Sequence, residues 1–119
     1  MATNYSRGAA FERAVRDLLE TDGYVVSRSA GSRSKVDLIG LKPGQILLVQ
    51  VKKYGTGTVS PGERAGLLRI ANAAGPTAVP VIAYKRAPRQ PIEFVQLTGP
   101  LAVDKVHWTP DEVATEVSQ

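Results

Sequence analysis

The sequence predicts an α/β fold, a single small domain in which a mixed central β-sheet is flanked by helices in the order αβββαβ. Three observations indicate this class. Apolar residues recur with a helical period near the N-terminus, an apolar run of strand type ends at Lys52, and a helix-start motif follows at Ser60. A chain of 119 residues has the length of one compact domain, so we expect residues 1–119 to form a single unit.

The first predicted element is a helix over about residues 6–22. Phe11, Val15 and Leu19 recur at intervals of four, which places them on one face of a helix. Gly23 follows at the position where glycine commonly ends a helix.

Three strands are expected next, over residues 24–29, 36–41 and 46–52. Pro43-Gly44 is a turn signal, so the second and third strands should form an antiparallel hairpin. Side chains alternate along a strand. One face of the third strand should therefore carry Ile46, Leu48, Gln50 and Lys52, and the other Leu47, Val49 and Val51.

The second half begins with a helix at Ser60-Pro61-Gly62-Glu63, which combines an N-cap serine, a proline at the first helical position and a capping-box glutamate. Strands are expected over residues 78–84 and 92–97. Pro80 would suit the start of its strand or an edge strand. Thr109-Pro110 repeats the helix-start chemistry and predicts a short C-terminal helix.

Composition excludes several kinds of protein. The chain has no cysteine, which rules out disulfides, thiolate metal sites and cysteine nucleophiles. No apolar run approaches the roughly 20 residues that span a bilayer, and residues 1–7 lack a hydrophobic signal segment. We expect no membrane contact and a cytoplasmic, nucleoid-associated location.

Positive charge is concentrated in the first half of the chain. Residues 1–53 hold nine Lys and Arg against five Asp and Glu, whereas residues 54–119 hold six of each. An excess of positive charge favours an anionic partner such as a phosphate backbone. Solubility alone would explain the same excess equally well.

Asp37, Gln50 and Lys52 form the most informative pattern, D-(x12)-Q-x-K, at the end of the predicted hairpin. An amide and an ammonium at a buried strand end need a partner, because an unpaired buried polar group costs roughly 1–3 kcal/mol. We expect Asp37 to be that partner. Mg²⁺ prefers such oxygen ligands, with one or two carboxylates. The Asp37 carboxylate, the Gln50 amide and the Val51 carbonyl are therefore candidate ligands, and Lys52 would offset charge in a phosphodiester hydrolysis.

Glu12 is the candidate second carboxylate. It follows Phe11, so it lies about 100° around the helix from that apolar residue, at the border of the buried face. From there it could reach a sheet edge. An exposed glutamate near the helix N-terminus, placed favourably in the helix dipole, remains the alternative from spacing alone.

Four segments carry a resemblance to a known family. They are Arg7-Gly8-Ala9-Ala10-Phe11-Glu12-Arg13, Arg28-Ser29-Ala30-Gly31-Ser32, Val36-Asp37-Leu38 and Val49-Gln50-Val51-Lys52. Their order and spacing resemble the archaeal-type Holliday junction resolvases of the PD-(D/E)xK nuclease superfamily. The likeness runs through most of the chain. It implies a restriction-endonuclease-like fold and a single nuclease domain.

The resemblance also implies a homodimer that binds four-way DNA junctions and nicks two opposing strands with Mg²⁺ or Mn²⁺. Glu12, Asp37 and Gln50 match the metal-binding acids of the family, and Lys52 matches the catalytic lysine. Ser32 matches a serine in the loop near the scissile phosphate. The family usually has glutamate where this chain has Gln50, so metal affinity should fall although an amide oxygen still coordinates a cation.

Several residues are candidates for DNA contacts. Arg13 and Arg28 match basic positions near the family's active site, and Arg33 and Lys35 lie in the serine loop. Tyr54 could stack on a base or sugar, or pack on its own loop. The full set of candidates is Arg7, Arg13, Arg28, Arg33, Lys35, Lys53 and Tyr54.

Three functions follow from these residues. The leading hypothesis is a metal-dependent, structure-specific endodeoxyribonuclease for four-way junctions. The alternatives are a less selective nuclease of the same superfamily, in repair or restriction, and a junction-binding protein without catalysis. Cleavage of junctions compared with linear duplexes separates the three.

Overall fold

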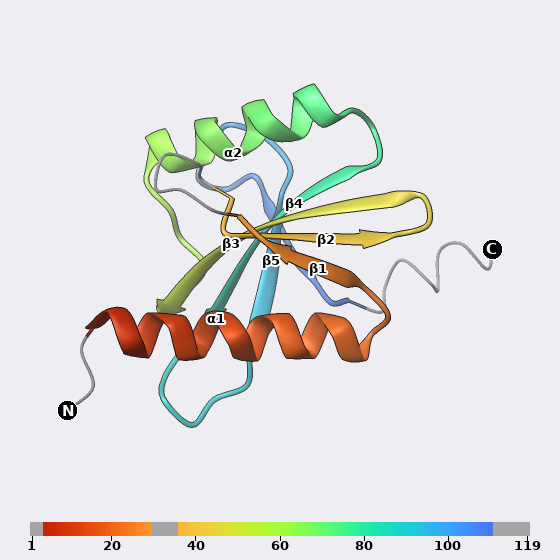
Figure 1. The fold of residues 1–119 in the computed structure, drawn as a ribbon. Helices are drawn as coiled ribbons and strands as arrows, with labels where there is room; N and C mark the ends of the chain where they lie inside the picture. Colours follow the sequence, from red (N-terminus) through yellow and green to blue (C-terminus); the bar gives the residue numbers. More distant parts are fainter. Residues whose placement is uncertain (1–3, 30–35, 111–119) are drawn as a thin grey trace.

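The computed structural model of the protein describes residues 4–29 and 36–110, and its elements are shown in Figure 1. In chain order they are α1 (Asn4–Thr21), β1 (Val25–Arg28), β2 (Leu38–Lys42), β3 (Gln45–Tyr54), α2 (Pro61–Ala74), β4 (Ala78–Lys85), β5 (Glu93–Leu97) and β6 (Lys105–Trp108).

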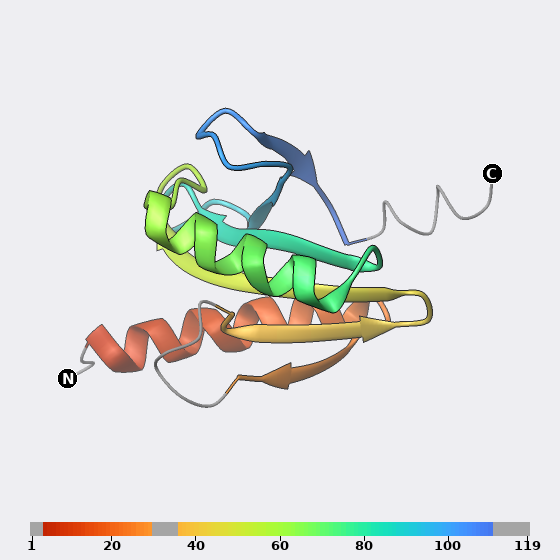
Figure 2. The same ribbon diagram turned by 90° about the horizontal axis from the view of Figure 1, so that it is seen from above.

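The six strands form one mixed sheet in the order β1-β2-β3-β4-β5-β6. Only β3 and β4 pair in parallel, and every other neighbouring pair is antiparallel. A parallel pair needs a crossover connection, which α2 provides. Figure 2 shows β1 and β6 at the two opposite edges, so β3 and β4 occupy the centre. The predicted α/β class with a mixed sheet is confirmed.

The two helices cover opposite faces of the sheet (Figure 1). On the α1 face, Phe11, Val15 and Leu19 pack against the sheet as the helical spacing predicts. On the α2 face, Leu67 and Ala71 pack against Leu48 and other strand residues. Each face of the sheet therefore has its own apolar core, and β3 contributes to both.

The alternation predicted for β3 is confirmed. Leu47 and Val49 belong to the core beneath α1, with Val51 packed at its border. Leu48 belongs to the core beneath α2, with Ile46 beside it. Because the alternation continues, Gln50 and Lys52 emerge on the α2 face, where the apolar part of the strand ends.

Helix α2 starts as the sequence predicts. The Ser60 hydroxyl accepts a hydrogen bond from the Glu63 amide at 3.1 Å, and the Glu63 carboxylate accepts one from the Ser60 amide at 3.0 Å. Pro61 occupies the first helical turn. This capping box fixes where the helix begins and therefore where the Glu63 side chain lies.

The structure differs from the sequence predictions at one strand, and it decides between the two placements predicted for Pro80. Strand β6 was missed, because a four-residue edge strand with a polar start carries little periodicity. Pro80 lies in β4, a central strand and not an edge. Proline has no backbone N–H to donate to a neighbouring strand. The structure accommodates Pro80 because it lies near the start of β4, before the pairing with β5 begins at Val81. The predicted C-terminal helix falls largely on residues 111–119, outside the described residues.

Neither helix of the described chain is long and apolar enough to cross a membrane.

Replacing Leu67 tests the α2 core. Its side chain is fully buried between helix and sheet, so Leu67→Ala should lower the free energy of unfolding by about 2–5 kcal/mol. Denaturant titration followed by circular dichroism measures this loss. Leu101→Ala removes a leucine that is 63% exposed and should change stability by less than about 0.5 kcal/mol. Equal effects of the two changes would contradict the described core.

Candidate active site

The candidate site lies where β3 ends and both helices begin. Figure 1 shows the first turns of α1 and α2 at the same end of the sheet, on opposite faces, near the arrowhead of β3. Glu63 lies in the first turn of α2, whereas Glu12 lies near the middle of α1. The sequence alone placed Glu12 in this region but not Glu63.

Asp37 lies at a break in the β2–β3 ladder. The regular register pairs Leu38 with Val49. The Asp37 amide also donates to the Val49 carbonyl, at 2.7 Å, which is one residue out of that register. The Asp37 carboxylate then accepts the Val51 amide at 2.7 Å. A side-chain oxygen therefore replaces a backbone acceptor, which fixes this carboxylate beside the end of β3.

Burial raises the pKa of the Asp37 carboxyl above its ordinary value, and the negative charge of Glu12 raises it further. The hydrogen bond from Val51 and the positive charges of Lys52 and Arg28 act in the opposite direction. These influences place Glu12, Lys52 and Arg28 within electrostatic range of Asp37. A desolvated acid among charges of both signs is typical of functional sites.

Gln50 and Lys52 both donate to Glu63 of α2. The Lys52 ammonium lies 2.6 Å from Glu63 Oε2, and the Gln50 amide nitrogen lies 3.1 Å from the same oxygen. Asp37 was the partner predicted from the sequence for these two groups. The structure differs because Gln50 and Lys52 project onto the α2 face, where the capping box holds Glu63.

The surroundings of Glu63 stabilise its charged form. The hydrogen bond from Lys52, followed by that from the Ser60 amide, lowers the pKa of Glu63 to about 2. Glu63 is therefore ionised throughout the physiological range, and it is the acid that balances the charge of Lys52.

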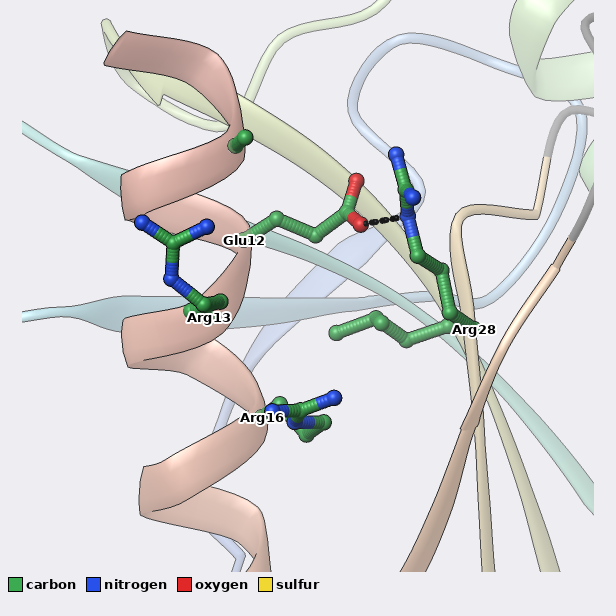
Figure 3. A pocket seen from close by; sticks show the side chains of 6 residues that line it. Glu12, Arg13, Arg16 and Arg28 are labelled. Carbon is green, nitrogen blue, oxygen red and sulfur yellow. Dashed lines mark hydrogen bonds and ion pairs between the residues drawn. The ribbon is translucent and has the colours of Figure 1, made fainter. Parts of the chain in front are cut away.

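Glu12 reaches from α1 toward β1, as Figure 3 shows, and its carboxylate pairs with the Arg28 guanidinium at 2.5 Å. The two side chains line a pocket of about 170 Å³ together with Ala9, Arg13, Arg16 and Leu38. The prediction that Glu12 reaches the sheet is confirmed in its geometry. Three arginines around one carboxylate make this pocket positive.

Arg16 adds a donor that the sequence analysis missed. It lies one helical turn after Glu12, on the side that lines the pocket (Figure 3). Its Nε atom is buried and has no hydrogen-bond partner among the described residues. A buried donor without a partner lowers the stability of the folded protein unless a ligand accepts its hydrogen bond. The i, i+4 spacing from Glu12 was the sequence signal that could have identified Arg16.

The other predicted DNA contacts have mixed outcomes. Tyr54, at the end of β3, is 50% exposed, and the Lys53 ammonium lies 5.3 Å from the centre of its ring. Arg7 lies within α1, but its side chain is outside the described part. Ser32, Arg33 and Lys35 also fall outside the described residues.

The oxygen donors around Asp37 decide whether a divalent cation fits. No three Asp, Glu or His side chains gather into a metal-binding group in the described part of the chain. However, Gln50 Oε1 is buried and has no hydrogen-bond partner there. This orphaned oxygen, the Asp37 carboxylate and a main-chain oxygen of Val51 match the few protein oxygens that Mg²⁺ requires. The residues present therefore fit a magnesium-type ion.

Glu63 is the second residue that the sequence analysis missed at this site. The motif Ser60-Pro61-Gly62-Glu63 was interpreted only as a helix start. Its position eleven residues after Lys52 was visible in the sequence, but the fold of the connecting loop was not. Only the structure shows that this helix start faces the end of β3.

The same fold occurs in a solved structure of a small α/β protein. A solved structure of Hjc from Archaeoglobus fulgidus, described as a Holliday junction resolvase from an archaeal hyperthermophile, superposes with a TM-score of 0.68. The match covers 92% of this chain and 97% of that one, at 24% sequence identity. At this identity the likeness shows the fold.

Sequence comparison shows the family. The profile of the archaeal Holliday junction resolvase (Hjc) family matches residues 3–113, so the chain belongs to that family. A crossover junction endodeoxyribonuclease Hjc from Methanocaldococcus jannaschii is 44% identical over 52 residues. That alignment covers 44% of this chain and 38% of the relative.

Removing the charge of Asp37 should stabilise the metal-free protein. Its pKa is raised in the folded state, so the ionised carboxylate opposes folding above that pKa. Asp37→Asn keeps an oxygen acceptor for Val51. We expect the variant to be more stable than the wild type at pH 7 in EDTA. The difference should shrink as pH falls and the wild-type carboxyl becomes protonated.

Thermal unfolding in EDTA between pH 3 and pH 7 measures this difference. The matched control is Asp17→Asn, which removes an exposed acid of α1 and should leave stability nearly unchanged. A variant that is less stable than the wild type at pH 7 would show that Asp37 serves folding, not a ligand.

Proposed function

We propose that this protein is a metal-dependent, structure-specific endodeoxyribonuclease that binds four-way DNA junctions and resolves them by paired nicks. The observation that carries this proposal is the group of charges around Asp37, namely Lys52, Glu12 and Arg28, in a chain of the Hjc family. The Gln50 oxygen, without a partner among the described residues, supports it. The relative from M. jannaschii is named a crossover junction endodeoxyribonuclease, which supports the same activity.

Nucleases of this family are metal-dependent in general, and we assign the cation as Mg²⁺ or Mn²⁺. When bound, such an ion neutralises charge on the phosphate and makes water more acidic. Asp37 and Gln50 Oε1 would hold it, with the Val51 carbonyl and Glu12 completing the protein ligands. Glu12 pairs with Arg28 in the structure, so it would exchange this partner when the site is filled.

Lys52 and the arginines of the pocket would neutralise the negative charge of the substrate phosphates. The Lys52 ammonium is fixed by Glu63, and a fixed positive charge stabilises the negative charge that develops in the transition state. Arg13, Arg16 and Arg28 line the adjacent pocket and would hold a backbone phosphate. Such contacts position DNA without reading its sequence. Recognition therefore rests on the shape of the junction and its backbone charge.

A four-way junction presents two equivalent strands related by two-fold symmetry. A homodimer with two sites would cut one strand at each site, and we include this assembly in the proposal. The loop residues Ser32, Arg33 and Lys35 would complete the phosphate contacts, together with Arg7, Lys53 and Tyr54. A nucleoid-associated location in the cytoplasm follows from this activity.

A second candidate function is favoured by one specific observation. Gln50 is a neutral amide where the family usually has an acid, and reduced charge weakens metal binding. The chain could then bind junctions without cutting them. Cleavage of junctions distinguishes an active resolvase from such a non-catalytic binding protein. Cleavage of linear duplex would instead indicate a less selective nuclease.

Junction cleavage is the first test. Labelled four-way junctions and linear duplexes are incubated with the protein and Mg²⁺, Mn²⁺ or EDTA. We expect symmetric paired nicks in junctions only, dependent on the cation. Lys52→Ala should reduce the single-turnover rate by about 10²–10³-fold while junction affinity is largely retained.

The control for this test is Lys105→Ala on β6, three strands away from β3 in the sheet, which should cut at the wild-type rate. Tight junction binding without any nick, even in Mn²⁺, would favour the non-catalytic candidate. Full activity of the Lys52→Ala variant would show that Lys52 has no role in catalysis.

The arginine pocket is tested by the salt dependence of binding. Each phosphate contact contributes about 0.9 to the slope of log affinity against log salt. Arg16→Ala should therefore weaken junction binding in EDTA or Ca²⁺ and reduce this slope by about one. Arg69→Ala, an exposed arginine on the opposite face at α2, is the matched control. Equal slopes for the Arg16→Ala variant and the wild type would place the DNA elsewhere.

A further inference from the structure

We propose that Glu63 is a positioning residue of the nuclease site, which carries on α2 the negative charge that the family usually carries at the position of Gln50. In this role it holds the Gln50 amide and the Lys52 ammonium in their working orientation. The inference rests on the proposed function and adds a residue that the four motif segments do not contain.

Both oxygens of Glu63 are fixed. Oε1 accepts the Ser60 amide at 3.0 Å. Oε2 accepts the Lys52 ammonium at 2.6 Å and the Gln50 amide nitrogen at 3.1 Å. The capping box therefore anchors one side of the carboxylate to the start of α2, and the other side faces β3. Few side-chain motions remain open to an acid held in this way.

This contact determines the orientation of the Gln50 amide. The NH₂ group donates to Glu63, and the reversed amide would place Oε1 against a carboxylate oxygen, which is repulsive. Oε1 must therefore point away from Glu63. It is buried there, with no hydrogen-bond partner among the described residues. Glu63 thus leaves the amide oxygen of Gln50 free of protein partners among the described residues, and this oxygen would be available to hold a cation.

Glu63 also restores the charge balance around Lys52. A site with Asp37, a glutamate at position 50 and Lys52 has a net charge of minus one. With the neutral Gln50, the same three positions would be uncharged. The carboxylate of Glu63, in contact with both Gln50 and Lys52, returns the group to minus one. Compared with the usual family pattern, the negative charge lies on α2 instead of β3, one hydrogen bond away from position 50.

A structural role alone would make Glu63 only a helix cap. The two roles are separable, because glutamine serves as well as glutamate at this position of a capping box. Glu63→Gln should therefore keep the start of α2 while removing the charge. Circular dichroism and the thermal midpoint in EDTA verify that the variant is folded.

The experiment measures Mn²⁺ affinity by isothermal titration calorimetry on the full chain, with cleavage of four-way junctions as a second measurement. Removing a residue that supports a metal ligand typically costs about 10–100-fold in affinity or activity. We expect this increase in the Mn²⁺ dissociation constant for Glu63→Gln. Glu93→Gln removes an acid of β5 that pairs with Arg86, and this variant should bind Mn²⁺ like the wild type.

An exchange variant makes the test specific for charge. Gln50→Glu combined with Glu63→Gln places the acid on β3 and the amide on α2, so the hydrogen bond between them persists with reversed polarity. We expect this double variant to recover most of the affinity and cleavage lost in Glu63→Gln. Gln50→Glu alone should keep or strengthen Mn²⁺ binding and lower stability in EDTA, because two carboxylates then lie side by side.

The possible outcomes separate this inference from the proposed function. Wild-type Mn²⁺ affinity and cleavage in Glu63→Gln would overturn the role of Glu63 while the nuclease assignment stands. An exchange variant no better than Glu63→Gln would overturn the charge argument. If the wild type binds Mn²⁺ but cuts no junction, the proposed function fails, and the comparison of affinities still decides the role of Glu63. Without Mn²⁺ binding by the wild type, both are overturned.

Discussion

The backbone amide of Val51 needs an acceptor, and the carboxylate of Asp37 supplies it. This interaction is possible because the β2–β3 ladder shifts by one residue at Asp37. Without the shift, a backbone oxygen would serve Val51 and the Asp37 side chain would be free to rotate. The irregularity therefore holds the Asp37 carboxylate in one position, where it is partly shielded from water. The remaining groups of the site are placed relative to it.

The sheet lies between two acids of different roles. Glu12 approaches from the α1 face and pairs with Arg28, next to the arginine pocket. Glu63 approaches from the α2 face and pairs with Lys52. Both ion pairs lie near Asp37, because Glu12, Arg28 and Lys52 all influence its carboxyl group. In the proposed function, substrate phosphates and a cation would compete for these same charges, so Glu12 would exchange its pairing with Arg28 when the site is filled.

Much of this arrangement follows from local patterns. The spacing of Phe11, Val15 and Leu19 predicted the face of α1, and the alternation along β3 predicted which of its side chains meet each helix. Strand β6 was not predicted, because four residues at a sheet edge have too little periodicity. The partner of Gln50 and Lys52 was expected to be Asp37 and is Glu63. This error arose because the β2–β3 hairpin, which brings Asp37 close to the end of β3, can be recognised in the sequence. The path of the loop that brings Glu63 there cannot.

The sequence by itself determined the face that α1 buries, the β2–β3 hairpin and the two faces of β3, because these depend on periodicity and short-range spacing. Tertiary structure alone decided that Glu63 pairs with Lys52 and that Arg16 lines the pocket of Glu12 and Arg28. Those contacts depend on how helices pack across a sheet and on where one ladder loses its register. Such long-range geometry results from the packing of the whole domain, and no single segment encodes it.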